Sequence, residues 1–171
     1  MSPRFRRNGV LLLGTWFAVS FFSWFAFAQS ASPKLDPATV ARGKYLTKIA
    51  GCNDCHTAGY LPSNGLVPQE QWLMGDQLGW RGPWGTTYAS NLRIFMAALS
   101  EDDWVQAARK LQTRPPMPWF TLNIMEESDL RAIYQFVRSL GPVGEPAPAY
   151  LAPGEVPQGP YAQFPSPPPG H

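Results

Sequence analysis

The sequence predicts an all-α fold of three main helices, joined by long loops and followed by an extended C-terminal tail. Apolar residues recur at helical spacing near residues 36–50, 101–112 and 126–140. Residues 57–99 lack a sustained period and are rich in glycine, proline and tryptophan, which indicates a long wrapping loop. The last 30 residues carry ten of the 19 prolines, a composition typical of extended backbone.

Capping residues place the ends of the first two helices. Asp36 and Pro37 read as an N-cap followed by proline at the first helical position, and this helix runs into Gly51. Ser100 and three acidic residues begin the second helix, and Pro115 lies beyond its end. Between these helices, residues 67–74 could add one short helix to the wrapping loop.

The third helix has the clearest pattern of the three. Its single apolar face consists of Leu130, Ile133, Phe136, Val137 and Leu140. Acidic residues near its start and Arg138 near its end complement the helix dipole. Gly141 and Pro142 then predict a clean stop, because glycine favours the helix end and proline cannot continue it.

The N-terminus has the features of a secretory signal peptide. Three arginines precede an apolar run at 10–27, and a small-residue cleavage site ends at Ala28. A retained membrane anchor is the alternative, because about 20 apolar residues can span a bilayer. We expect cleavage after Ala28, which gives a signal peptide at 1–28, a folded domain at 35–141 and a proline-rich tail at 142–171.

The mature chain would be close to neutral. Three of the 14 basic residues lie in the predicted signal peptide, which leaves 11 basic against 12 acidic side chains. No Lys/Arg cluster indicates a nucleic acid or an anionic membrane as partner. A domain of this size buries a marginal core, so a bound apolar group would supply part of its interior.

Residues 52–56, Cys-Asn-Asp-Cys-His, form a C-x-x-C-H sequence, which in an exported protein is the attachment site of a c-type haem. Cysteines three positions apart on a helix share one face, so both can bond to vinyl groups of one porphyrin. The following histidine can then bind the iron. A disulfide or a redox dithiol is the alternative, but neither needs that histidine. We predict one covalent haem c, held by Cys52 and Cys55 and ligated by His56.

A second stretch, Pro115-Pro116-Met117-Pro118-Trp119, offers a sixth ligand to the iron. Methionine sulfur can take this position, and a histidine and methionine pair raises the reduction potential. The flanking prolines favour an extended conformation for Met117. The alternative is that Met117 fills a gap in the core. Three further methionines of the mature chain compete for the role: Met74, Met96 and Met125.

Four aromatic residues of the predicted loop suit the rim of a haem pocket, because each combines an apolar body with a polar edge. They are Trp72, Trp80, Trp84 and Tyr88. Ordinary core packing is the alternative for each of them. Arg81 is a weaker candidate to pair with a haem propionate, by charge alone.

Three features resemble the class I cytochrome c family over about residues 36–142: the first helix running into the C-x-x-C-H sequence, the Pro-Pro-Met-Pro-Trp stretch, and the last helix. The chain is also similar to the haem domains of cytochrome subunits of periplasmic membrane-bound dehydrogenases, in Tyr-Ala-Ser-Asn at 88–91 and Met-Pro-Trp at 117–119. After Asn91 and Leu92, that subfamily is expected to continue with Thr-Pro-Asp, but this chain has Arg-Ile-Phe at 93–95. Because of this departure we assign Asn91 no role.

The resemblance implies a class I cytochrome c-like fold around one low-spin haem, with the first and last helices crossed. It implies a periplasmic carrier of single electrons between a dehydrogenase and a respiratory acceptor, an oxidase or another cytochrome. Such a protein is no enzyme by itself, although it can be the cytochrome subunit of a dehydrogenase complex. The alternative is a haem-c enzyme, or a gas or redox sensor, whose sixth iron position can open.

Gly43 gives one packing prediction within this fold. Glycine inside a helix costs about 1 kcal/mol relative to alanine, which suggests that another element approaches closely. If the first and last helices cross, we expect Gly43 to lie against Phe136. Simple tolerance of the glycine is the alternative.

Overall fold

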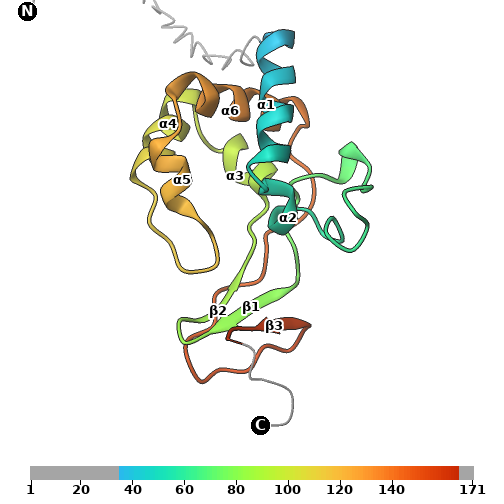
Figure 1. Ribbon diagram of the computed structural model, residues 1–171, viewed down its shortest axis with the longest axis vertical. Helices are drawn as coiled ribbons and strands as arrows, with labels where there is room; N and C mark the ends of the chain where they lie inside the picture. Colours follow the sequence, from blue (N-terminus) through green and yellow to red (C-terminus); the bar gives the residue numbers. More distant parts are fainter. Residues whose placement is uncertain (1–34, 166–171) are drawn as a thin grey trace, which may run out of the picture. The chain divides into compact units, whose positions relative to one another are not determined.

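The computed structural model describes residues 35–165, in which helices gather at one end of the domain and a small sheet lies at the other (Figure 1). The predicted signal peptide at 1–28, with its alternative of a retained anchor, lies outside the described residues. Between residues 35 and 165, no helix is long and apolar enough to span a membrane.

All three predicted helices are present, close to the expected bounds. They are α1 (Pro37–Ile49), α4 (Glu101–Lys110) and α6 (Glu127–Ser139). The Asp36 carboxylate caps α1 by accepting the N–H of Thr39 at 2.8 Å. Ser100 and Asp103 form a reciprocal capping box at the start of α4. The predicted caps of both helices are therefore confirmed.

α1 and α6 cross in contact (Figure 1). Gly43 of α1 is buried at this crossing, where an added Cβ would collide with the carbonyl of Ala132 and lie 2.7 Å from the Cβ of Phe136. The predicted contact between Gly43 and Phe136 is thus confirmed. α4 packs on α6, where the indole N–H of Trp104 donates to the carbonyl of Leu130 at 2.8 Å.

The prediction of an all-α fold is wrong, because three short strands form a mixed sheet. They are β1 (Gly79–Gly82), β2 (Gly85–Tyr88) and β3 (Tyr161–Gln163). β1 pairs with β2 in an antiparallel hairpin and with β3 in parallel, which gives the order β2-β1-β3. Glycine occupies both ends of β1, and the strands have at most four residues, so strand propensity gave no usable signal.

The described residues form three short helices besides the three that the sequence predicted. They are α2 (Cys52–His56), α3 (Leu92–Ala97) and α5 (Trp119–Ile124). The expected loop at 57–99 contains both the hairpin and α3. The short helix expected at 67–74 is reduced to one 3₁₀ turn, η1 (Gln69–Gln71).

Asn91 and Arg93 tie α3 to the end of α6. The Asn91 side chain caps α3 by accepting the N–H groups of Arg93 and Ile94 at 3.0 and 3.1 Å. The buried Arg93 guanidinium donates to the carbonyls of Leu140 and Gly141. A helix C-terminus leaves its last carbonyls unsatisfied, so Arg93 supplies donors that α6 lacks. Asn91 therefore has a structural role that the family resemblance did not assign.

The proline-rich tail lies against the domain and runs from α6 to the sheet (Figure 1). The Tyr150 hydroxyl donates to the carbonyl of Trp84 at 2.9 Å. Leu151 forms an antiparallel bridge with Thr86, and β3 completes the sheet further on. Backbone and side-chain bonds therefore fix the tail to the hairpin.

Candidate functional site

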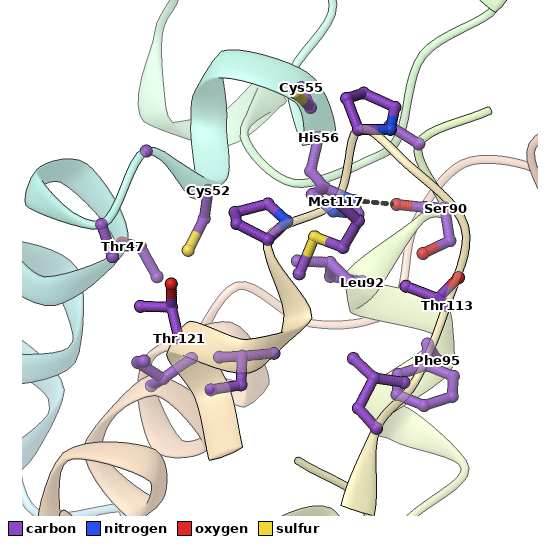
Figure 2. Close-up of a pocket in the computed structure, with 18 of the residues that line it drawn as sticks. Thr47, Cys52, Cys55, His56, Ser90, Leu92, Phe95, Thr113, Met117 and Thr121 are labelled. Atoms are coloured by element: carbon purple, nitrogen blue, oxygen red, sulfur yellow. Dashed lines mark hydrogen bonds between the residues drawn. The ribbon is translucent and has the colours of Figure 1, made fainter. Parts of the chain in front are cut away.

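A cavity of about 380 Å³ lies between the helices and the hairpin. Most of its walls come from the adjoining ends of α1 and α2, segment 87–92, α3, the connection before α5, and α5 itself. Trp80 of β1, Trp104 of α4 and Ile133 of α6 complete the lining. Most side chains that line it are apolar. All four predicted site residues lie around this space: Cys52, Cys55, His56 and Met117. Figure 2 shows the sulfur atoms of Cys52 and Met117 facing its centre.

α2 presents both cysteines to the cavity. Gly51 has a φ of +70°, which allows the chain to turn from α1 into α2 without strain. Cys52 and Cys55 lie one helical turn apart and are free thiols, so the structure contains no disulfide between them. Burial raises the pKa of Cys52 to about 11 and also raises the pKa of Cys55. Both groups are therefore neutral thiols at pH 7.

The His56 ring is oriented by a backbone carbonyl. Its Nδ1 lies 2.7 Å from the carbonyl oxygen of Ser90, just before α3 (Figure 2). A carbonyl can only accept, so Nδ1 carries the proton and Nε2 keeps its lone pair. Burial also lowers the pKa of His56, which favours the neutral ring. This tautomer is the one that binds a metal through Nε2, with the other nitrogen held by an outer partner.

Met117 enters the cavity from the connection between α4 and α5. Pro116 and Pro118 flank it and line the same wall. Because α2 and this connection are separate elements, His56 and Met117 reach the cavity independently of each other. The structure thus brings an imidazole and a thioether to the lining of one cavity.

Two of the competing methionines also line the cavity. Met96 belongs to α3 and is fully buried in the core, and Met125 directly follows α5. Met74 is absent from the cavity lining. Met117 differs from Met96 and Met125 in its neighbours, because a proline stands on each side of it.

The donor set fits a haem better than a bare ion. Within residues 35–165, no group of three or more His, Cys, Asp or Glu side chains could hold a metal ion. One imidazole and one thioether instead suit an iron whose four remaining positions are filled by a porphyrin. The apolar walls suit the ring, and the two thiols of α2 suit thioether attachment. The buried Nε1 of Trp80 adds a donor that has no acceptor in the described part of the chain.

The four predicted rim aromatics divide into two groups. Trp80 and Tyr88 line the cavity. Trp72 packs in the core, with its indole N–H donating to a backbone carbonyl, and Trp84 packs outside the cavity on the hairpin. Arg81 also lies outside the cavity lining and stacks on the ring of Tyr161 instead.

Two residues of the site were missed by sequence analysis. Ser90 acts through its backbone carbonyl, which carries no residue-type signal. Arg114 is the one charged side chain among the described residues that line the cavity, yet in the sequence it is an isolated arginine before two prolines.

No protein-family model matches the chain, and no solved structure matches it significantly. The chain is similar to the gluconate 2-dehydrogenase cytochrome c subunit of Pantoea cypripedii, with 26% identity over 132 residues. The similar region covers 70% of this chain but 27% of that protein, so the chain spans about a quarter of its relative's length. This similarity supports a relationship to c-type cytochromes only loosely.

Proposed function

We propose that the protein is a monohaem c-type cytochrome that carries single electrons between a dehydrogenase and a respiratory acceptor. The observation that carries this proposal is the convergence of Cys52, Cys55, His56 and Met117 on one apolar cavity. The name of the similar protein, a cytochrome c subunit of a dehydrogenase, agrees with the same class of function.

In this proposal each of the four side chains has one task. Cys52 and Cys55 add their S–H groups across two vinyl groups, so that each sulfur forms a thioether and each proton goes to the neighbouring carbon. Nε2 of His56 would bind the haem iron, with the ring kept in position by the carbonyl of Ser90. The Met117 thioether would bind the same iron. The bound haem would supply a one-electron iron couple.

Filling both axial positions favours an electron carrier over a haem enzyme or a gas sensor. An enzyme or sensor needs a position on the iron where peroxide, oxygen or another small molecule can bind. Exposure of the ferrous, haem-loaded protein to carbon monoxide tests this choice. A carrier leaves the absorption spectrum unchanged at neutral pH, whereas rapid stoichiometric binding would favour the enzyme or sensor.

We also propose a periplasmic location, a cleaved signal peptide and a periplasmic dehydrogenase as electron donor. The support is the pattern at 1–28, the C-x-x-C-H sequence and the name of the similar protein. The acceptor would be an oxidase or another cytochrome. A membrane contact is expected only if the N-terminal segment is kept or through such a complex.

Docking to these partners would use the apolar outer face of α5. Phe120 is 60% exposed and Ile124 is 81% exposed, while Thr121 and Leu122 of the same helix line the cavity. A partner on this face would come within one helix thickness of the cavity. Such transient interfaces are small, generally below about 1,200 Å².

Stopped-flow reduction by candidate dehydrogenases, measured over a salt series, tests the docking proposal. Apolar docking predicts that the rate changes little with salt and falls when Ile124 is replaced by Asp. The matched control is Leu66→Asp, because Leu66 is equally exposed at 81% but lies outside the cavity lining. A steep salt dependence would reject apolar docking in favour of steering by charge.

A further inference from the structure

Two donors that have no hydrogen-bond acceptor among residues 35–165, one buried and one exposed, lie where the hairpin and the connection before α5 meet the cavity. They are the indole N–H of Trp80 and the guanidinium of Arg114. We infer that they bind the two carboxylate groups of the haem, and that the C-terminal tail holds both donors in place. This inference rests on the proposed function and makes the tail a part of the haem site.

The first donor is marked by its lack of a partner. Nε1 of Trp80 is shielded from solvent and has no hydrogen-bond partner among residues 35–165. The indole N–H groups of Trp72, Trp84 and Trp104 all donate to backbone carbonyls. Buried donors are normally paired, because an unpaired one loses its hydrogen bonds to water without replacement. Trp80 therefore offers a buried donor for which the described part of the chain supplies no acceptor.

The second donor is a cation without a counter-ion. No Asp or Glu within residues 35–165 pairs with Arg114, whose Cζ instead lies 3.8 Å from the centre of the Tyr150 ring. Stacking on an aromatic face holds a guanidinium while leaving its N–H groups available at the edge. Arginine donates to carboxylates in a paired geometry that makes these bonds stronger than neutral ones.

The tail positions both donors. Tyr150 supplies the ring under Arg114, and its own hydroxyl is fixed by the bond to the carbonyl of Trp84. Phe164 lies with its ring centre 5.8 Å from that of Trp80 and 6.2 Å from that of Trp84. Tyr150 therefore contacts Arg114, and Phe164 contacts Trp80.

Backbone pairing makes these contacts specific. In the sheet, Trp80 of β1 stands opposite Ala162 of the tail, two residues before Phe164. The hairpin is joined in turn to the connection that carries Arg114, because the Thr87 hydroxyl donates to the carbonyl of Pro115 at 2.9 Å. Trp80, Arg114 and the tail thus belong to one hydrogen-bonded unit.

The chemistry of haem matches this arrangement. A haem carries two propionates on the part of the ring away from the vinyl groups. The thiols that would bond the vinyl groups come from α2, whereas Trp80 and Arg114 come from other walls of the cavity. A carboxylate placed against apolar walls is costly unless it is paired or hydrogen-bonded. One cation and one buried donor provide such partners.

The test uses the full-length haem-loaded protein and pairs of matched variants. Arg114→Gln is compared with Arg81→Gln, since Arg81 also stacks on a tyrosine of the tail but lies outside the cavity lining. Trp80→Phe is compared with Trp84→Phe, since both rings contact Phe164 but only Trp80 lines the cavity. The measurements are the reduction potential and the propionate bending band in resonance Raman spectra.

Arg114→Gln is expected to lower the potential, because loss of a cation near the iron favours the more positive ferric state. The expected shift in the ratio of oxidised to reduced protein is about tenfold, which corresponds to about 59 mV for a one-electron couple. Trp80→Phe is expected to lower the potential by less and to shift the propionate band. The two control variants are expected to leave both measurements unchanged.

The role of the tail is tested at Tyr150. Tyr150→Phe keeps the ring under Arg114 and loses the hydroxyl bond, so it should retain the wild-type potential and propionate band. Tyr150→Leu removes the ring and should lower the potential in the same direction as Arg114→Gln. If Tyr150→Leu lowers the denaturation midpoint but leaves the potential and the band unchanged, the tail is only a structural strap and its positioning role is overturned.

The remaining outcomes separate this inference from the proposed function. If Arg114→Gln and Trp80→Phe behave like their control variants in a protein that carries a haem, the inference fails and the proposed function stands. In that case Arg114 only holds the tail, and water satisfies Trp80. If the wild-type protein carries no haem, the proposed function fails before the variants are compared.

Discussion

Gly43 and Phe136 lie so close that a Cβ added to the glycine would be 2.7 Å from the Cβ of the phenylalanine. Real Cβ atoms do not approach one another to this distance, so any side chain at Gly43 must push α1 away from α6. These two helices make the largest contact between elements of the domain. The crossing therefore depends on the absence of one side chain.

Gly43→Ala should destabilise the protein in spite of the better helix propensity of alanine. Overpacking a core usually costs about 1–3 kcal/mol, which exceeds the ~1 kcal/mol that alanine gains over glycine in a helix. Chemical denaturation of the haem-loaded protein measures the difference. Gly159→Ala is the control, because an added Cβ there meets only the carbonyl of Gln77 at 3.9 Å. An unchanged midpoint for Gly43→Ala would contradict the packing.

Met117→Ala should open the sixth position of the iron. Ferrous protein with this substitution is expected to bind carbon monoxide rapidly, and its reduction potential should fall because the thioether is lost. Absorption spectra and a redox titration measure both effects. The same substitution at Met96 or Met125 is the control, since both line the cavity from other positions. Carbon monoxide binding by either control, but not by Met117→Ala, would assign the sixth ligand to that methionine.

Arg93→Gln should loosen the end of α6. The guanidinium is buried and donates to the carbonyls of Leu140, Gly141 and Glu70. Hydrogen bonds to charged groups contribute about 1.5–3 kcal/mol, and glutamine cannot reach all three acceptors. Denaturant unfolding measures the loss. Arg109→Gln, in the exposed last turn of α4, should stay within about 0.5 kcal/mol of wild type.

The cap of α1 predicts a dependence of stability on pH. Side-chain and backbone hydrogen bonds from Thr39 lower the pKa of Asp36 below its ordinary value. A carboxyl group whose pKa is lowered on folding stabilises the protein at pH values above its unfolded pKa, which is about 3.9. This stabilisation is lost as the pH falls through the folded pKa. Asp36→Ala should therefore lower the melting temperature at pH 7, and the difference from wild type should shrink in acid.

Asp36→Asn is the matched control for that measurement. Asparagine caps a helix about as well as aspartate but does not titrate over this range. Its melting temperature should stay near that of wild type at pH 7. A difference between wild type and Asp36→Ala that persists unchanged in acid would show that the carboxylate charge does not support the cap.

The sequence predicted α1, α4 and α6 because each has a helical apolar period and recognisable ends. Ser100 with Asp103, and Gly141 after α6, are local signals that need no knowledge of the fold. The C-x-x-C-H spacing and the prolines around Met117 are local in the same way. The sequence could therefore single out these residues without the helix α2, which it did not predict.

The sheet and the outer site residues could not be predicted in this way. β1 pairs with a strand of the tail about 80 positions away, and neither strand is longer than four residues. Arg114 lines the cavity and stacks on Tyr150 of the tail, and Ser90 contributes a backbone atom. Such roles arise from tertiary contacts and leave no trace in local sequence.

Mass spectrometry of the mature protein, made in cells with haem-attachment machinery, tests the central claim most directly. We predict a mass increased by one haem, carried on the peptide that contains Cys52 and Cys55. Replacing both cysteines by alanine should abolish the added mass. An unmodified wild-type protein whose two cysteines form a reducible disulfide would contradict covalent haem attachment and the electron-carrier function that depends on it.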